Sequence, residues 1–127
     1  SHFDIDSEVF YADFKWDSIL EQIETQNFKL KTIPKFPKVK RDLALLLDKN
    51  ISFNSIRESA IKSERNLLKN INLFDVYTGS KLPKDKKSYA ISFTLQDEKK
   101  TLTDKQIDKI MKKLQHNFEK DFGAILR

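Results

Sequence analysis

Side chains that could recognise a nucleobase stand two residues apart in three separate segments of the chain. They are Asp42 and Ala44, Asp75 and Tyr77, and Ser88 and Ala90. Carboxylates and hydroxyls can accept or donate hydrogen bonds at base edges. An exposed tyrosine ring offers a stacking surface that contributes about 1–3 kcal/mol per base in single-strand complexes. Alanines let a ligand approach the backbone closely, so the pattern indicates a base-reading surface.

Lysines flank these positions and could follow a phosphate backbone. The candidates are Lys38, Lys40, Lys81, Lys84, Lys86 and Lys87. The whole chain of 127 residues has a formal net charge of +5, with 34% of its residues charged. Such a basic but mixed surface suits a polyanionic partner.

Period-two alternation predicts that the candidate residues lie on one face of a sheet. Residues 39–47, 71–77 and 87–95 read as strands, and the third shows large apolar residues at every second position from Tyr89 to Leu95. These large residues must face the core, so Ser88 and Ala90 face outward. In the second strand we expect Phe74 and Val76 to point inward, which leaves Asp75 and Tyr77 outside.

Two helix signals separate the strands. Ser52 or Ser55 can cap the first helix, and Thr103-Asp-Lys-Gln106 forms a capping box for the second. Gly123 supplies a stop, followed by a short strand in residues 124–127. The order β-α-β-β-α-β predicts an α+β ferredoxin-like sandwich, a four-stranded antiparallel sheet with both helices on one face.

The first 35 residues read as a leader, and residues 36–127 as the main domain. Residues 9–16 are rich in strand formers, a short helix follows Asp17 or Ser18, and residues 28–33 form a second extended piece before Pro34. Because the chain opens without methionine, we expect it to be a piece of a longer polypeptide.

Composition excludes several kinds of site. There is no cysteine, so neither a disulfide framework nor a thiolate metal site can form. No apolar run approaches the length of a membrane span, and no signal peptide is visible, so we expect a cytoplasmic protein without membrane contact. His2 and His116 are far apart and form no catalytic pair.

Five motifs follow one another at fitting spacings along the chain. They are Phe36-Pro-x-x-x-Arg-Asp-Leu-Ala44, Leu73-Phe-Asp-Val-Tyr-x-Gly79, Leu82-Pro-x-x-Lys-Lys-Ser88, Lys100-Thr-Leu-Thr-Asp104 and Gly123-Ala-x-Leu-Arg127. Together they resemble the C-terminal ferredoxin-fold anticodon-binding domain of the bacterial phenylalanyl-tRNA synthetase beta subunit. The resemblance implies a domain that binds the anticodon stem-loop of phenylalanine tRNA.

The resemblance also assigns roles to residues. It implies that Tyr77 stacks on an anticodon base, that Asp75 and Ser88 read its polar edge, and that Asp42 and Ala44 shape the floor. It further implies an alpha-subunit partner in an (αβ)₂ assembly through the parent chain. ATP and Mg²⁺ would be used by the parent enzyme, whereas this piece would carry neither a catalytic site nor a cofactor.

Other interpretations stay open at the level of sequence. One is a ferredoxin-like module that docks a protein or binds a regulatory small molecule. Leu46, which alternation places on the outward face of the first strand, favours this slightly, and Leu73 would do so if it also faces outward. This sequence lacks the signature of an RNA recognition motif on its third strand. It also lacks the arginine–asparagine anion site of an acylphosphatase-like enzyme. Alternation sends Arg41 to the helix side, where it could pair with an acidic residue or reach around the edge of the sheet, and the sequence does not decide between the two. The outward residues could also be an ordinary solvated surface.

Overall fold

The computed structural model describes residues 5, 7–23 and 33–127. The chain divides into two compact units, Ser1–Thr32 and Ile33–Arg127. In the first unit the described residues contain one helix, α1 (Trp16–Glu21), which confirms the short helix of the leader. The predicted start after Asp17 or Ser18 is wrong, because both residues lie within the helix and its N-cap, Lys15, makes no side-chain capping bond. Residues 9–15 carry no strand, since none of their backbone is paired in the sheet. The second extended piece lies, apart from Ile33, outside the described residues.

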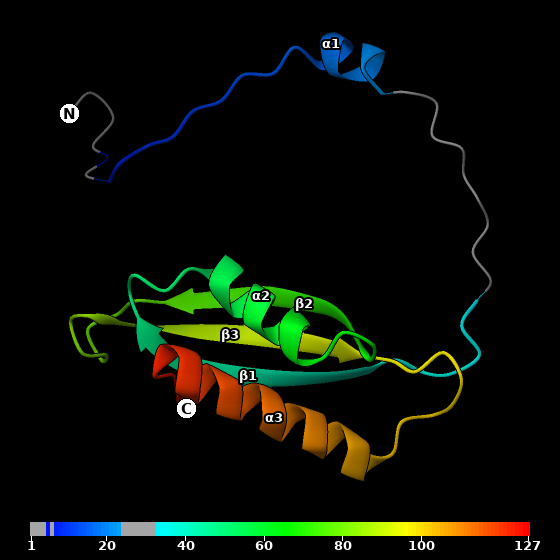
Figure 1. The fold of residues 1–127 in the computed structure, drawn as a ribbon. Helices are drawn as coiled ribbons and strands as arrows, with labels where there is room; N and C mark the ends of the chain where they lie inside the picture. Colours follow the sequence, from blue (N-terminus) through cyan, green and yellow to red (C-terminus); the bar gives the residue numbers. More distant parts are fainter. Residues whose placement is uncertain (1–4, 6, 24–32) are drawn as a thin grey trace. The chain divides into compact units, whose positions relative to one another are not determined.

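The second unit is a ferredoxin-like sandwich, as predicted. Its elements are β1 (Val39–Asp48), α2 (Phe53–Ser63), β2 (Leu68–Tyr77), β3 (Lys86–Leu95), α3 (Asp104–Phe122) and β4 (Ile125–Leu126). The strands form one antiparallel sheet in the order β2-β3-β1-β4. Helices α2 and α3 cover the same face of this sheet (Figure 1). One face is therefore packed, and we call the other the open face.

The core lies between β3 and the two helices. Tyr89, Ile91, Phe93 and Leu95 are all buried, and Phe93 stacks on Phe118 of α3 with 6.1 Å between ring centroids. β3 pairs with β1 along its whole length and with β2 on its other side. Because neighbouring residues of paired strands share a face, the pleat of β3 assigns the faces of both neighbours.

β2 departs from the expected alternation. Register shifts mark irregularities between Leu68 and Asn70 and between Leu73 and Asp75. At the second of them, one extra residue, Phe74, is accommodated, so the side chains on either side of it lie on opposite faces. The prediction that Phe74 points into the core is wrong, since it is 57% exposed, and Leu73 packs against the core instead.

Val76 pairs with buried Tyr89 and so shares its side of the sheet, but it remains largely exposed. The edge position of β2 explains this exposure, because the helices cover the centre of the sheet more fully than its rim. Asp75 and Tyr77 still fall on the open face, opposite Ala90 and Ser88.

The boundaries of α2 and α3 follow the predicted capping residues. The side chain of Ser52 accepts a hydrogen bond from the backbone N–H of Ser55 at the start of α2. Thr103 and Gln106 form a reciprocal capping box at the start of α3. Gly123 ends α3 with φ of 60°, a left-handed conformation that favours glycine.

Two polar contacts lie near the point where the chain enters the sandwich. Buried Gln96 donates from Nε2 to the carbonyl of Phe36 at 2.7 Å, which ties the entry to the end of β3. The guanidinium of Arg41 lies 3.8 Å from the carboxylate of Asp104, the first residue of α3. Of the two possibilities left open for Arg41, the structure shows the acidic partner, although both groups are well exposed.

None of the helices in the described part of the chain is long and apolar enough to cross a membrane.

A matched pair of substitutions tests the corrected facing of β2. Phe93→Ala should reduce the free energy of unfolding by about 3–5 kcal/mol, because it empties a fully buried site. Phe74→Ala should reduce it by less than about 1 kcal/mol, because the ring is mostly exposed. Chemical denaturation followed by circular dichroism measures both. A large loss for Phe74→Ala would contradict the bulged register.

Candidate nucleic-acid interface

The register brings most of the predicted site residues into two adjacent rows on the open face. Ala44, Ala90 and Asp75 lie side by side across β1, β3 and β2. Leu46, Ser88 and Tyr77 form the next row. A concavity of about 500 Å³ opens over these rows; its lining residues are Ala44, Asp75, Tyr77, Lys81, Ser88, Ala90 and Arg127. Four of the five residues predicted to contact a base therefore line one hollow.

Tyr77 forms a wall of this hollow and is held by two neighbours. A Cβ atom added at Gly79 would overlap the phenol ring of Tyr77, so the ring lies against the bare backbone of this glycine. The guanidinium carbon of Arg127 lies 6.0 Å from the centroid of the same ring, at the outer range of a cation–π contact. With 37% of the residue exposed, the ring is supported and still accessible.

The floor of the hollow is made of small side chains. Ser88 is only 7% exposed, because Leu46 and Tyr77 flank it across the sheet. Ala44 and Ala90 are partly buried beside Asp75. A planar ligand could thus reach the level of the backbone between an aromatic wall and a carboxylate, with one hydroxyl below it.

Asp42 lies outside the hollow. It faces Ser92 of β3 and, across it, Asn72 of β2, one row beyond Ala44 on the same open face. This row continues the polar surface of the open face by one step beyond the hollow.

The six lysines do not form one group. Lys81 lines the hollow and Lys84 is exposed in the same β2–β3 loop. Lys38 is exposed just before β1, and Lys40, opposite Thr94, lies two rows from the hollow.

Lys86 and Lys87 already have partners within the chain. Lys86 pairs with Asp48 at 2.7 Å. Lys87 is 9% exposed and faces the helix side, where its Nζ donates to the carbonyl of Lys49 at 2.8 Å and lies 4.5 Å from the Tyr89 ring centroid. The structure therefore gives Lys87 a packing role and does not place it with the other cations.

Sequence reasoning missed Arg127 and the part played by Gly79. The final strand is two residues long, too short for alternation to locate the residue after it. In the sequence Gly79 is only the last residue of a motif, since a contact between a ring and a glycine two residues away leaves no periodic trace.

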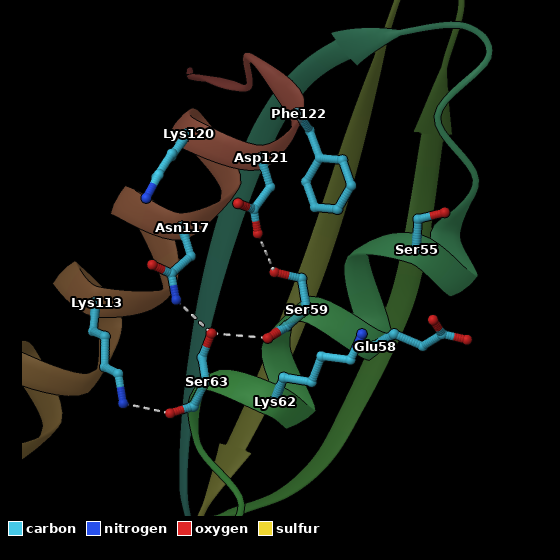
Figure 2. A pocket seen from close by; sticks show the side chains of 10 residues that line it. All are labelled: Ser55, Glu58, Ser59, Lys62, Ser63, Lys113, Asn117, Lys120, Asp121 and Phe122. Atoms are coloured by element: carbon cyan, nitrogen blue, oxygen red, sulfur yellow. Dashed lines mark hydrogen bonds between the residues drawn. The ribbon is translucent and has the colours of Figure 1, made fainter.

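A second, more polar cleft lies between α2 and α3, on the packed side of the sheet (Figure 2). Here Ser59 donates to Asp121 at 3.0 Å, and Asn117 donates to the hydroxyl of Ser63. Lys113 donates to the backbone carbonyl of Ser63. These bonds join one helix to the other, so the cleft serves helix packing.

Comparisons with known proteins show the family of the chain. A family model described as the ferredoxin-fold anticodon binding domain matches residues 34–127. The chain is 54% identical over 125 residues to a phenylalanine–tRNA ligase beta subunit from Bacteroides fragilis, covering 98% of this chain and 15% of that protein. Beta subunits from Porphyromonas gingivalis, 46% identical with the same coverage, and Clostridium acetobutylicum, 36% identical over 126 residues (99% of this chain, 16% of that protein), are also similar.

The chain spans about 15% of the length of these curated relatives. The family model, by contrast, covers the described sandwich from its entry to its last residue. The chain belongs to the ferredoxin-fold anticodon-binding domain family.

Proposed function

We propose that this chain is the anticodon-binding module of a phenylalanine–tRNA ligase beta subunit and that it docks the anticodon stem-loop of phenylalanine tRNA on the open sheet face. One observation carries the proposal: the hollow over Ala44 and Ser88 combines a supported aromatic ring, a carboxylate and a hydroxyl on a floor of small residues. Those are the groups needed to stack a splayed base and to pair with its polar edge.

In this proposal each residue has a distinct task. The ring of Tyr77 stacks on an anticodon base, and Asp75 and Ser88 bond to the edge of that base. Ala44 keeps the floor low, and Asp42 meets the neighbouring nucleotide from the next row. No proton transfer or bond cleavage is required of any of them, so the module acts by binding alone.

The lysines supply the electrostatic part of binding. Lys81 and Lys84, with Lys38 and Lys40 farther along the sheet, follow the phosphates on either side of the hollow. Lys86 contributes less because Asp48 partly neutralises it, and Lys87 is left out because its ammonium is enclosed.

The parent enzyme completes the activity. The proposal places aminoacylation, with ATP and Mg²⁺, in other parts of a cytoplasmic ligase whose alpha subunit joins the beta subunit in an (αβ)₂ assembly. Residues 1–35 then form the link to the preceding part of the beta chain.

A protein-docking module is the second candidate. Phe74 and Val76 expose apolar surface on the edge strand β2, where a partner protein could add contacts. Such a module would lose partner binding on substitution of Phe74 and would show no salt-linked RNA binding.

The central test is titration of the 127-residue chain with a phenylalanine-tRNA anticodon stem-loop and with one whose anticodon bases are altered. We expect micromolar or weaker affinity and a preference for the cognate loop. Tyr77→Ala should lower affinity for the cognate loop about five- to hundredfold, the equivalent of one lost base stack. Thermal stability should hardly change, because the ring lies outside the core.

Tyr11→Ala, which removes an exposed ring from the leader, is the matched control and should bind like the unmodified chain. Equal binding of both loops by the unmodified chain would contradict base reading on the open face.

Removing one lysine from the hollow should change the salt dependence of binding and leave base preference intact. Lys81→Gln should lower the slope of log K against log salt by about 1, since one phosphate contact is lost. Lys109→Gln, at an exposed position of α3 on the packed side, carries the same charge change and should leave the slope unchanged. Filter binding at several salt concentrations measures both. Identical slopes for the two variants would contradict a contact between Lys81 and the RNA.

Gly79→Ala should weaken cognate binding although it replaces none of the side chains proposed to contact RNA. Gly79 does not have a positive φ, so the added methyl group acts only by displacing the ring of Tyr77. Ser80→Ala, one residue further in the same loop, is the control and should bind normally. If Gly79→Ala binds as tightly as the unmodified chain, then the resting position of the ring is not the one that binds the base.

A further inference from the structure

Arg127 brings a planar cation into the hollow that holds Tyr77. Its backbone N–H donates to the carbonyl of Ala44 at 2.9 Å, one residue beyond the pairing of β4 with β1. This bond fixes the backbone of Arg127 beside the floor of the hollow. Its guanidinium then lies 6.0 Å from the Tyr77 ring centroid.

The guanidinium has unused donors. Within the described part of the chain, no hydrogen bond or ion pair engages it, and its one recorded partner is the Tyr77 ring. The guanidinium of Arg41, by comparison, donates to the carbonyl of Lys40 and pairs with Asp104. A guanidinium presents five N–H donors in a rigid plane, which suits paired acceptors such as a base edge or a phosphate.

We propose that Arg127 is a second RNA-contacting side chain, which donates hydrogen bonds to acceptor atoms of the nucleotide that stacks on Tyr77. The inference rests on the proposed function and adds a specific role for this residue to it. Asp75 and Ser88 reach the stacked base from the sheet, whereas Arg127 approaches it from β4 at the side of β1. The nucleotide would be held from both sides of the hollow.

The test compares Arg127→Gln with Arg57→Gln in titrations with cognate and altered stem-loops at two salt concentrations. Both substitutions remove one positive charge, but Arg57 is an exposed residue of α2 on the packed side of the sheet. Arg127→Gln should weaken cognate binding about tenfold or more, as expected for loss of a bidentate contact, and Arg57→Gln should have little effect. Arg127→Lys should restore only part of the affinity, because an ammonium cannot reproduce the planar fork.

Salt dependence separates the two sources of acceptors. If the contact is to a phosphate, Arg127→Gln lowers the salt slope and weakens both loops equally. If it is to a base edge, the preference for the cognate loop falls and the slope changes less. Either result supports the proposal.

A double substitution separates contact from positioning. If Arg127 contacts RNA, Arg127→Gln should weaken binding further in the Tyr77→Ala background. Should the second substitution have no effect there, Arg127 acts only by holding the ring, and the proposal is overturned.

Equal behaviour of Arg127→Gln and Arg57→Gln, with cognate preference intact in the unmodified chain, would overturn it and leave the proposed function standing. Loss of cognate preference in the unmodified chain itself would overturn both.

Discussion

The pairing of β3 on both sides is the constraint on which the rest of the structure depends. Its large apolar residues leave it no choice of face, since turning them outward would expose the whole core. β1 and β2 inherit their facing from this strand through the register. The open face is therefore defined by what β3 must hide, and Ser88 and Ala90 are outward because Tyr89 and Ile91 are inward.

The hollow on that face owes its shape mainly to side chains that are short or missing. Ala44 and Ala90 keep the floor near the backbone, and Gly79 leaves room for the ring of Tyr77. Stability and recognition are thereby separated across the thickness of one sheet. Core residues such as Phe93 determine whether the domain folds, while the residues over the hollow can change with little effect on packing.

Most of the fold could be predicted because its signals are local and repeated. Alternation along β3 indicates a strand within a few residues, and the capping box at Thr103 indicates the start of a helix. The parts that could not be predicted depend on single events. The irregularity at Phe74 interrupts the alternation, and no neighbouring glycine or proline predicts it. Arg127 is positioned at the hollow by one backbone hydrogen bond to Ala44. Tertiary position decides such features, and a periodic pattern carries no record of it.

The extra residue in β2 has a consequence for how this domain can vary. Leu73 lies on the packed face and Asp75, two residues later, on the open one because Phe74 is an extra residue outside the alternation. Deleting that single residue would make Leu73 and Asp75 direct neighbours in a regular strand, so Leu73 would stay packed and Asp75 and Tyr77 would stay on the open face. The strand can therefore lose one residue at this point and still present the same recognition surface, whereas regular alternation through Phe74 would turn Asp75 and Tyr77 towards the helices. The bulge thus separates the facing of the binding residues from the length of the strand.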